Sequence, residues 1–196
     1  KRSIFKERRK INYKLIFAVI LLAGMSILLI SYAISAIASQ KDELYEQGVD
    51  AYDSASYEQA IDLFKSALAE NQLFSKKKDQ NIELYMADSY LKSAQYAEAS
   101  ATYKELIDSS FSGSNIKDLH ELATALDDFS KGNYGGALDV LLKQADTYPE
   151  LYMYIGTCYA VTDDIDNMFA SYEKYVQTFG FNSYVYAMYG SYYMNS

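Results

Sequence analysis

The chain has 196 residues, half of them apolar and 22% charged, which is a globular composition with room for a membrane segment and one domain. The apolar content excludes extensive disorder, and the single Pro and nine Gly exclude collagen-like or low-complexity sequence. One Cys and one His exclude a disulfide framework, a Cys-based zinc site and a multi-His metal site, so we expect no cofactor.

The net charge of −8 is divided unevenly along the chain. Residues 1–14 carry seven basic residues and one acid, hence +6, whereas residues 41–196 carry 11 Lys, 25 acids and no Arg, hence −14. Nucleic acid is bound through Lys and Arg at its phosphates, and such an acidic domain repels it. We therefore expect no nucleic-acid partner.

Residues 15–40 contain no charged residue, and this stretch of 26 residues exceeds the roughly 20 that a bilayer requires. We predict a transmembrane helix here, preceded by a basic cytoplasmic tail over residues 1–14. The positive-inside rule then places the N-terminus in the cytoplasm and the rest of the chain outside. The alternative is a secreted domain after signal-peptide cleavage near Ala38, because Ala36-Ile37-Ala38 has the small-x-small pattern of a cleavage site.

A pattern of Tyr-x2-Ala-x3-aromatic recurs after the uncharged stretch. It starts at Tyr57, Tyr96 and Tyr134, and more loosely at Ile165, with spacings of 39, 38 and 31 residues. Each copy follows an apolar segment that carries a small residue and then a large one. These residues resemble the tetratricopeptide repeat (TPR), a helix–turn–helix unit of 34 residues.

The resemblance implies an all-α chain, in which the transmembrane helix is followed by a TPR-like α-solenoid of about four helix pairs plus one extra helix over residues 41–196. The repeats are expected near residues 41–72, 80–111, 116–149 and 150–180, with a partial fifth at 183–196. The corresponding helices are expected near residues 41–54, 57–70, 80–94, 96–109, 116–131, 134–147, 150–161, 165–178 and 183–195.

The last predicted helix resembles the first helix of a fifth repeat and has neither a second helix nor a polar outer face. Solenoids need polar caps for solubility. We therefore interpret the chain as part of a longer protein, cut within its repeat array. The alternative is that this helix docks on a partner.

Four local features invite a catalytic, metal-binding or lipid-binding interpretation, and each has a simpler structural one. Cys158 lies mid-helix among apolar residues and is expected in the core, and His120 is expected on the surface or in a groove. The acids of residues 163–166 lack the Gly and Glu of a calcium loop and are expected to form a turn and helix cap. Residues 76–78 are three Lys, expected in a solvated loop and few for binding anionic lipid. We expect no catalytic residue, no metal ligand and no enzyme activity.

In the TPR family the first helix of each pair lines a concave groove, so the resemblance implies a partner-binding groove in this chain. Its predicted lining is Tyr45, Val49, Tyr52, Leu84, Leu91, Lys92, Leu119, Leu122, Leu126, Phe129 and Met153, with Asp88 and Thr157 on the same helix faces. This lining is apolar and aromatic, which suits an apolar peptide or an amphipathic helix. A clamp for a terminal carboxylate would have Lys92 alone. The alternative is that these residues pack against neighbouring helices.

The function expected from these features is that of a membrane-anchored TPR scaffold, which gathers protein or peptide partners at the extracytoplasmic face of a membrane such as that of a bacterium. No small-molecule substrate is evident. The alternative is the anchor-and-repeat portion of a larger enzyme or sensor whose catalytic part lies beyond Ser196.

Overall fold

The computed structural model describes residues 13–70, 75–113 and 115–195, and these residues form nine α-helices and no strand. The helices are α1 (Tyr13–Asp53), α2 (Tyr57–Ala69), α3 (Lys76–Lys92), α4 (Tyr96–Asp108), α5 (Ile116–Ser130), α6 (Tyr134–Gln144), α7 (Leu151–Val161), α8 (Ile165–Phe179) and α9 (Ser183–Asn195). The predicted all-helical class is thereby confirmed, while the predicted basic tail lies almost entirely outside the described residues.

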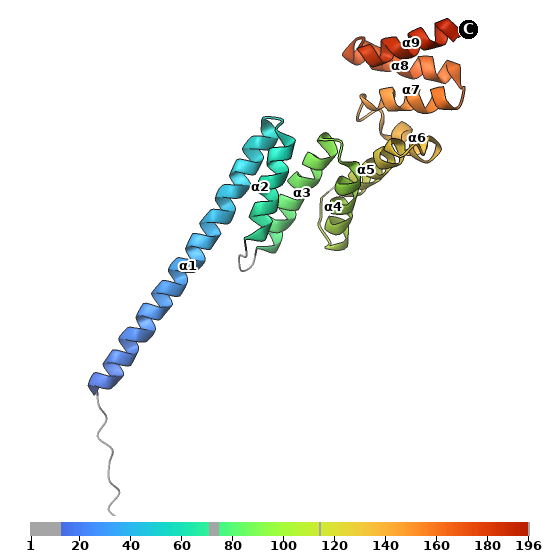
Figure 1. The fold of residues 1–196 in the computed structure, drawn as a ribbon. Helices are drawn as coiled ribbons and strands as arrows, with labels where there is room; N and C mark the ends of the chain where they lie inside the picture. Colours follow the sequence, from blue (N-terminus) through green and yellow to red (C-terminus); the bar gives the residue numbers. More distant parts are fainter. Residues whose placement is uncertain (1–12, 71–74, 114, 196) are drawn as a thin grey trace, which may run out of the picture.

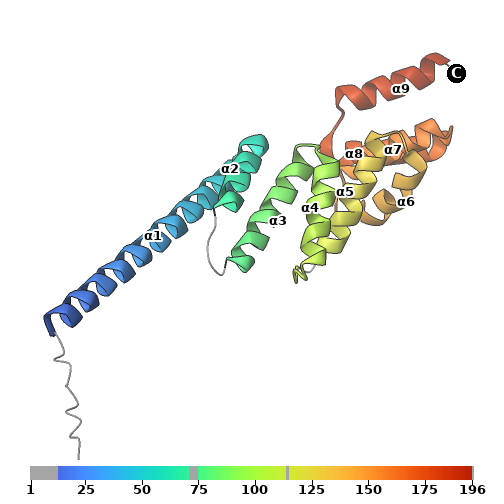
Figure 2. The same ribbon diagram turned by 60° about the horizontal axis from the view of Figure 1, so that its bottom comes forward.

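Each helix from α1 to α7 packs against the next one in the chain. Helix α9 joins the end of this array through Val185, whose fully buried side chain lies with Met168 and Tyr172 of α8. The helices follow one another as a row of neighbours, and the long α1 projects from one end of the row while α9 lies at the other (Figures 1 and 2). This arrangement is compatible with a helical repeat.

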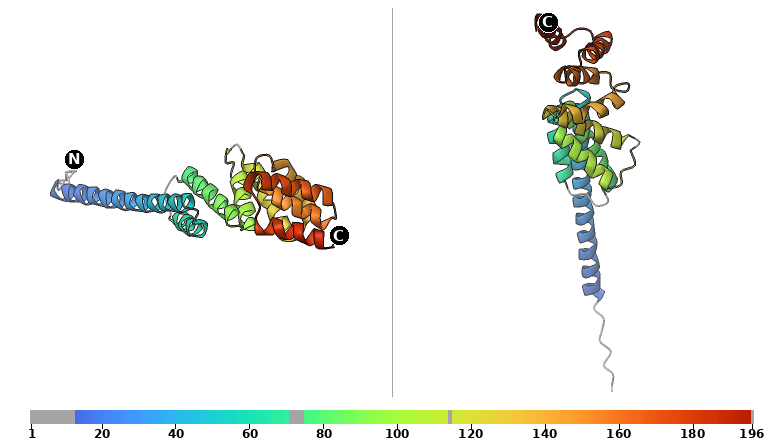
Figure 3. Two further views of the ribbon diagram at one scale, coloured as in Figure 1. Left: turned by 90° about the horizontal axis from the view of Figure 1, so that it is seen from above. Right: turned by 90° about the vertical axis from the view of Figure 1, so that its right-hand side faces the viewer.

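Helix α1 runs without a break through the position where a separate helix was expected to start, near residue 41. No Pro and no turn sequence separates the uncharged stretch from the polar residues that follow it, so nothing ends the helix before Asp53. Every side chain from residue 17 to residue 35 is exposed, and α1 stands clear of the other helices there (Figure 3). This helix is long and apolar enough to cross a membrane.

The helices form four pairs, which are α1 with α2, α3 with α4, α5 with α6, and α7 with α8. The same turn joins the two helices of each pair. One residue of this turn has positive φ. The N–H of the residue after it donates to the carbonyl of the residue five positions earlier in the chain, as in a Schellman motif. The positive-φ residues are Ala55, Ala94, Gly132 and Asp163, with φ of 56°, 60°, 82° and 54°. The four closing N–H···O distances lie between 2.8 and 3.0 Å. These residues are 39, 38 and 31 positions apart, which is the spacing of the sequence pattern.

A small residue of the first helix faces a large residue of the second in the pairs that begin and end the array. A Cβ built on Gly48 would lie 2.5 Å from Phe64 Cε1, and one built on Gly156 would lie 2.5 Å from Tyr172 Cε1. Both partners stand 16 positions apart in sequence. The same separation of 16 links two further buried pairs, Ala87 with Tyr103 and Ala125 with Leu141. Four helix pairs thus share both a turn and a core contact.

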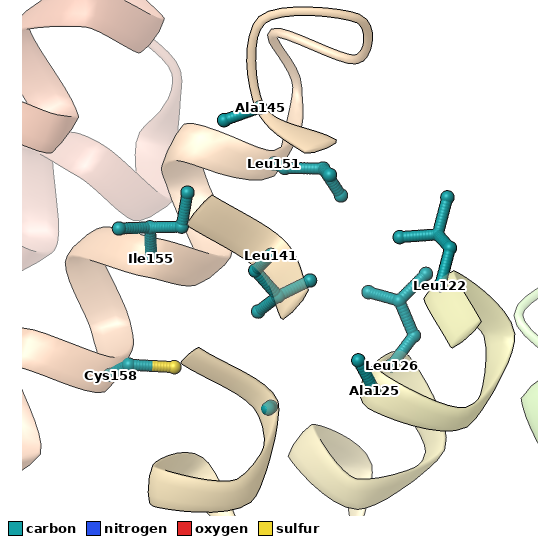
Figure 4. Packing of buried hydrophobic residues seen from close by; sticks show 9 residues of the cluster. Leu122, Ala125, Leu126, Leu141, Ala145, Leu151, Ile155 and Cys158 are labelled. Carbon is teal, nitrogen blue, oxygen red and sulfur yellow. The ribbon is translucent and has the colours of Figure 1, made fainter. Parts of the chain in front are cut away.

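The buried residues gather in clusters between neighbouring helices. In the cluster drawn in Figure 4, Leu122, Ala125 and Leu126 of α5 face Leu141 of α6 and residues of α7. Cys158 is 1% exposed in the same cluster, so its predicted place in the core is confirmed.

The expectation that residues 76–78 form a loop is wrong. Helix α3 begins at Lys76, four residues earlier than expected, and the three Lys form its first turn. Three Lys are unfavourable in the first turn of a helix, because the helix dipole is positive at its N-terminus. Contacts of this turn with α1 offset that cost: Lys78 pairs with Asp42, and Asp79 pairs with Lys41.

Candidate binding groove

A pocket of about 380 Å³ opens on one side of the helix row. Most of its lining comes from α1, α3, α5 and α7, the first helices of the four pairs, and the rest from α4 and from the segments before α5 and α7. The lining residues are Tyr52, Asp88, Leu91, Lys92, Tyr96, Asn115, Leu119, Leu122, Leu126, Tyr148, Glu150, Leu151 and Tyr154.

The structure brings together part of the predicted groove. Six of the eleven predicted residues line the pocket, as does Asp88: these six are Tyr52, Leu91, Lys92, Leu119, Leu122 and Leu126. They come from three successive first helices, as the predicted register required. Whether this lining binds a partner stays a prediction.

The other five predicted residues pack against neighbouring helices, as in the alternative interpretation. Tyr45 and Val49 pack on the core between α1, α2 and α3, and Leu84 packs on the next core cluster. The Phe129 ring lies edge-on to Tyr134 and Tyr154, with centroid distances of 5.2 and 5.1 Å. Met153 is half-buried, with its sulfur 3.9 Å from Asn182 Nδ2.

Two of the pocket-lining leucines belong to the core. Leu122 is 3% exposed and Leu126 is 5% exposed, and both pack on Leu141 and Leu151. They therefore offer a ligand little surface. A charged substitution at either position would disturb the fold, so neither is suitable for testing binding.

The aromatic part of the rim was missed by the sequence analysis. Tyr96 and Tyr154 both line the pocket, with a hydroxyl–hydroxyl distance of 3.2 Å, and Tyr148 adds a third ring from the segment before α7. Tyr154 is one residue from the predicted Met153, and a step of one residue turns a helix face by about 100°. Tyr148 lies outside a helix, where apolar periodicity gives no signal. Tyr96 was assigned to the repeat pattern rather than to the groove.

The pocket contains one carboxyl group with a perturbed acidity, that of Asp88. Burial raises its pKa above the ordinary value, and a hydrogen bond from the Tyr103 hydroxyl and the charge of Lys92 oppose this in part. Burial and the nearby charge of Asp88 also raise the pKa of Tyr52 to about 12. The lining thus combines tyrosine hydroxyls with the carboxyl groups of Asp88 and Glu150 and the amino group of Lys92.

The groups most capable of chemistry lie outside this pocket. Burial raises the pKa of the Cys158 thiol to about 11, so a thiolate is disfavoured. The His120 ring contacts the Ser100 carbonyl through Nδ1 at 3.1 Å and lines a smaller hollow over α5 and α6. Within the described part of the chain, no cluster of three or more His, Cys, Asp or Glu residues is placed to hold a metal ion.

No protein-family model matches this sequence, and no curated protein matches it either. The fold and the pocket define an all-helical protein in which consecutive helices pack on one another. One N-terminal helix has the length and the apolar surface needed to cross a membrane.

Proposed function

We propose that the protein is a membrane-anchored TPR-like scaffold that binds an amphipathic or apolar peptide segment of a partner on the extracytoplasmic side. The observation that carries this proposal is the pocket itself: first helices of successive pairs converge on it, and six residues predicted from the repeat resemblance line it. The shared turn and the 16-residue small–large contact support the assignment of a repeat.

The chemistry of the lining indicates what kind of peptide fits. The rings of Tyr52, Tyr148 and Tyr154 and the side chains of Leu91 and Leu119 can cover apolar anchors. Each fully buried apolar side chain contributes about 1.5–3 kcal/mol. A micromolar complex needs about 8 kcal/mol after association costs, so several anchors must bind together. This favours a segment with apolar residues on one face.

The charge of the domain indicates what surrounds these anchors. A net charge of −14 over residues 41–196 attracts basic partners and repels acidic ones. Inside the pocket, Asp88 accepts hydrogen bonds, whereas Lys92 accounts for the only positive charge of the lining. The best ligand is therefore an amphipathic segment whose polar face is basic, and its association rate falls as salt is added.

The test is a selection of peptides from a random displayed library on the full chain held in nanodiscs. The enriched peptides should share apolar residues at helical spacing and basic flanks. Tyr148→Ala should weaken their binding at least tenfold, because the half-buried ring lines the pocket. The ring also packs on the core cluster, so circular dichroism of the variant must show the helical signal of the parent. Tyr186→Ala, on the exposed side of α9, is the matched control and should bind as the parent does.

Two results would count against the proposal. Failure to enrich any peptide over empty nanodiscs would indicate that the pocket has no peptide ligand. Equal affinity of the parent and of the Tyr148→Ala variant would place the binding site on another face.

A further inference from the structure

The first turn of α3 is an electrostatic exception in an acidic domain. It contains three consecutive Lys at the helix end where positive charge is least favourable. Lys78 is paired with Asp42 of α1. Lys76 and Lys77 are exposed, and among the described residues no acid pairs with either of them. These two ammonium groups are therefore free to meet a partner.

The contacts of the same turn fix where these lysines stand along α1. Lys41 is 1% exposed, and its Nζ lies 2.5 Å from Asp79 Oδ1 and 3.0 Å from the Glu70 carbonyl oxygen. Gln40, the last residue of the uncharged stretch, donates from Nε2 to Glu70 Oε1 at 2.9 Å. The end of α2 and the start of α3 are thus fastened to α1 at the residue where its apolar part ends.

Lys76 and Lys77 lie on the side of this junction that faces the projecting part of α1. Lys76 precedes Asp79 by three residues, or about 4.5 Å along the helix, and α3 starts at the end of the row from which the apolar part of α1 extends (Figure 1). If α1 spans a bilayer, both lysines are at the depth of its headgroups.

We propose that Lys76 and Lys77 form a basic edge that contacts the anionic headgroups of the bilayer in which α1 is anchored. This inference rests on the proposed membrane anchor. Three acids of this junction, Asp42, Glu70 and Asp79, are each engaged by a basic or amide side chain of the same junction. The two free lysines therefore give the edge its charge.

Two lysines are too few to recruit a protein from solution, because each one near an anionic surface strengthens binding only about fivefold. Here α1 already holds the domain at the surface, so the contact is intramolecular and the lysines need only favour one orientation. Together they favour the orientation with this edge on the bilayer by about 25-fold. The remaining acidic domain is repelled by the same surface, which holds the other end of the row away from it.

The experiment places a dye at this edge and a quencher in the headgroups. The full chain carries Cys158→Ser and Ala69→Cys, since Cys158 is buried and Ala69 is an exposed residue at the end of α2. The labelled protein is reconstituted into nanodiscs of phosphatidylcholine alone or with phosphatidylglycerol, each containing a headgroup spin-labelled lipid. The variant is Lys76→Gln with Lys77→Gln.

The control is Lys131→Gln with Lys174→Gln, which removes two exposed lysines far along the row, one directly after α5 and one in α8. We expect stronger quenching in the anionic discs than in the neutral ones for the parent and for the control. The Lys76→Gln/Lys77→Gln variant should give the neutral-disc value in both, and added salt should lower the parent to the same value.

Equal quenching of the parent in the two kinds of disc would overturn this inference alone, as would retention of the difference in the Lys76→Gln/Lys77→Gln variant. A chain that fails to co-purify with either kind of disc would overturn the membrane anchor itself. Circular dichroism of each variant shows whether the helices are retained.

Discussion

The first and last helix pairs share their internal packing and differ in how the next helix is attached. In both, a glycine of the first helix admits an aromatic ring of the second, Phe64 against Gly48 and Tyr172 against Gly156. Helix α3 is then attached to the first pair partly by charge, through Lys41. Helix α9 is attached to the last pair by Val185 and a group of aromatic rings, without an ion pair among the described residues. The comparison indicates that the contact within a pair defines the unit, whereas the contact between units is free to vary.

The largest effect should come from breaking the charged attachment of α3. Lys41→Ala removes the ammonium group that pairs with Asp79 and donates to the Glu70 carbonyl, and it also removes a buried stem. Breaking a buried ion pair in this way costs about 3 kcal/mol. The free energy of unfolding, measured by urea titration of the full chain in a mild detergent, should fall by that amount. Lys104→Ala, which removes an exposed pair with Asp108, should change it by less than about 1 kcal/mol.

The contact within the pair is tested by adding one methyl group at each end of the row. Gly48→Ala and Gly156→Ala each force a Cβ against a ring, which costs about 1–3 kcal/mol and exceeds the gain of about 1 kcal/mol from better helix propensity. Both should lose stability by similar amounts. Gly135→Ala meets nothing within 4 Å and should gain up to about 1 kcal/mol. A loss at only one of the two glycines would break the equivalence of the two pairs.

The turn shared by the pairs offers a stabilising change. Ala94 has φ of 60°, a conformation that strains a residue with a Cβ. Ala94→Gly relieves this strain and should raise the unfolding midpoint by an amount equivalent to about 0.5–1 kcal/mol. Ala101→Gly, at an exposed position inside α4, should lower it by about 1 kcal/mol. A loss at Ala94 as large as that at Ala101 would contradict the assigned turn.

The smallest expected effect is a pH dependence of the free energy of unfolding that arises from Asp88 in the pocket. Burial raises the pKa of Asp88 in the folded state above its unfolded value, so the folded state binds this proton more tightly. The ionised carboxylate therefore costs stability at neutral pH, and this cost disappears as the pH falls through the raised pKa toward the unfolded value. Asp88→Asn should be slightly more stable than the parent at pH 7, and the difference should shrink on acidification. A difference that grows toward low pH would have the opposite sign and would refute the assigned shift.

Local turn signals made most of the fold predictable from the sequence. The starts of α2, α4, α6 and α8 were predicted to the residue, because each follows a short polar turn with the same spacing to the next. The continuity of α1 was missed because the boundary at residue 41 was placed by charge, and a change of charge does not end a helix. The early start of α3 depends on Asp42 and Lys41, which are distant in sequence and give no local signal.

The pocket was predictable only in part, for a related reason. Helical periodicity identified one face on the first helix of each pair. This correctly assigned Leu91, Leu119 and Lys92 to the lining of the pocket. It could not separate residues that line a groove from those that fill the core beneath it, such as Leu126. It also could not find Tyr148, whose position depends on the path of a connection rather than on a helix face.

We propose that α1 is both the membrane anchor and the first helix of the row, with the row outside the cell. The most direct measurement is labelling of single cysteines by a membrane-impermeant maleimide in intact cells, in a Cys158→Ser background. Lys131→Cys, on the surface of the row, should be labelled at once, and Ser3→Cys only after the membrane is permeabilised. Gly24→Cys, in the apolar part of α1, should react only after the protein is denatured. Labelling of Ser3→Cys but not of Lys131→Cys in intact cells, or rapid labelling of Gly24→Cys, would contradict the account.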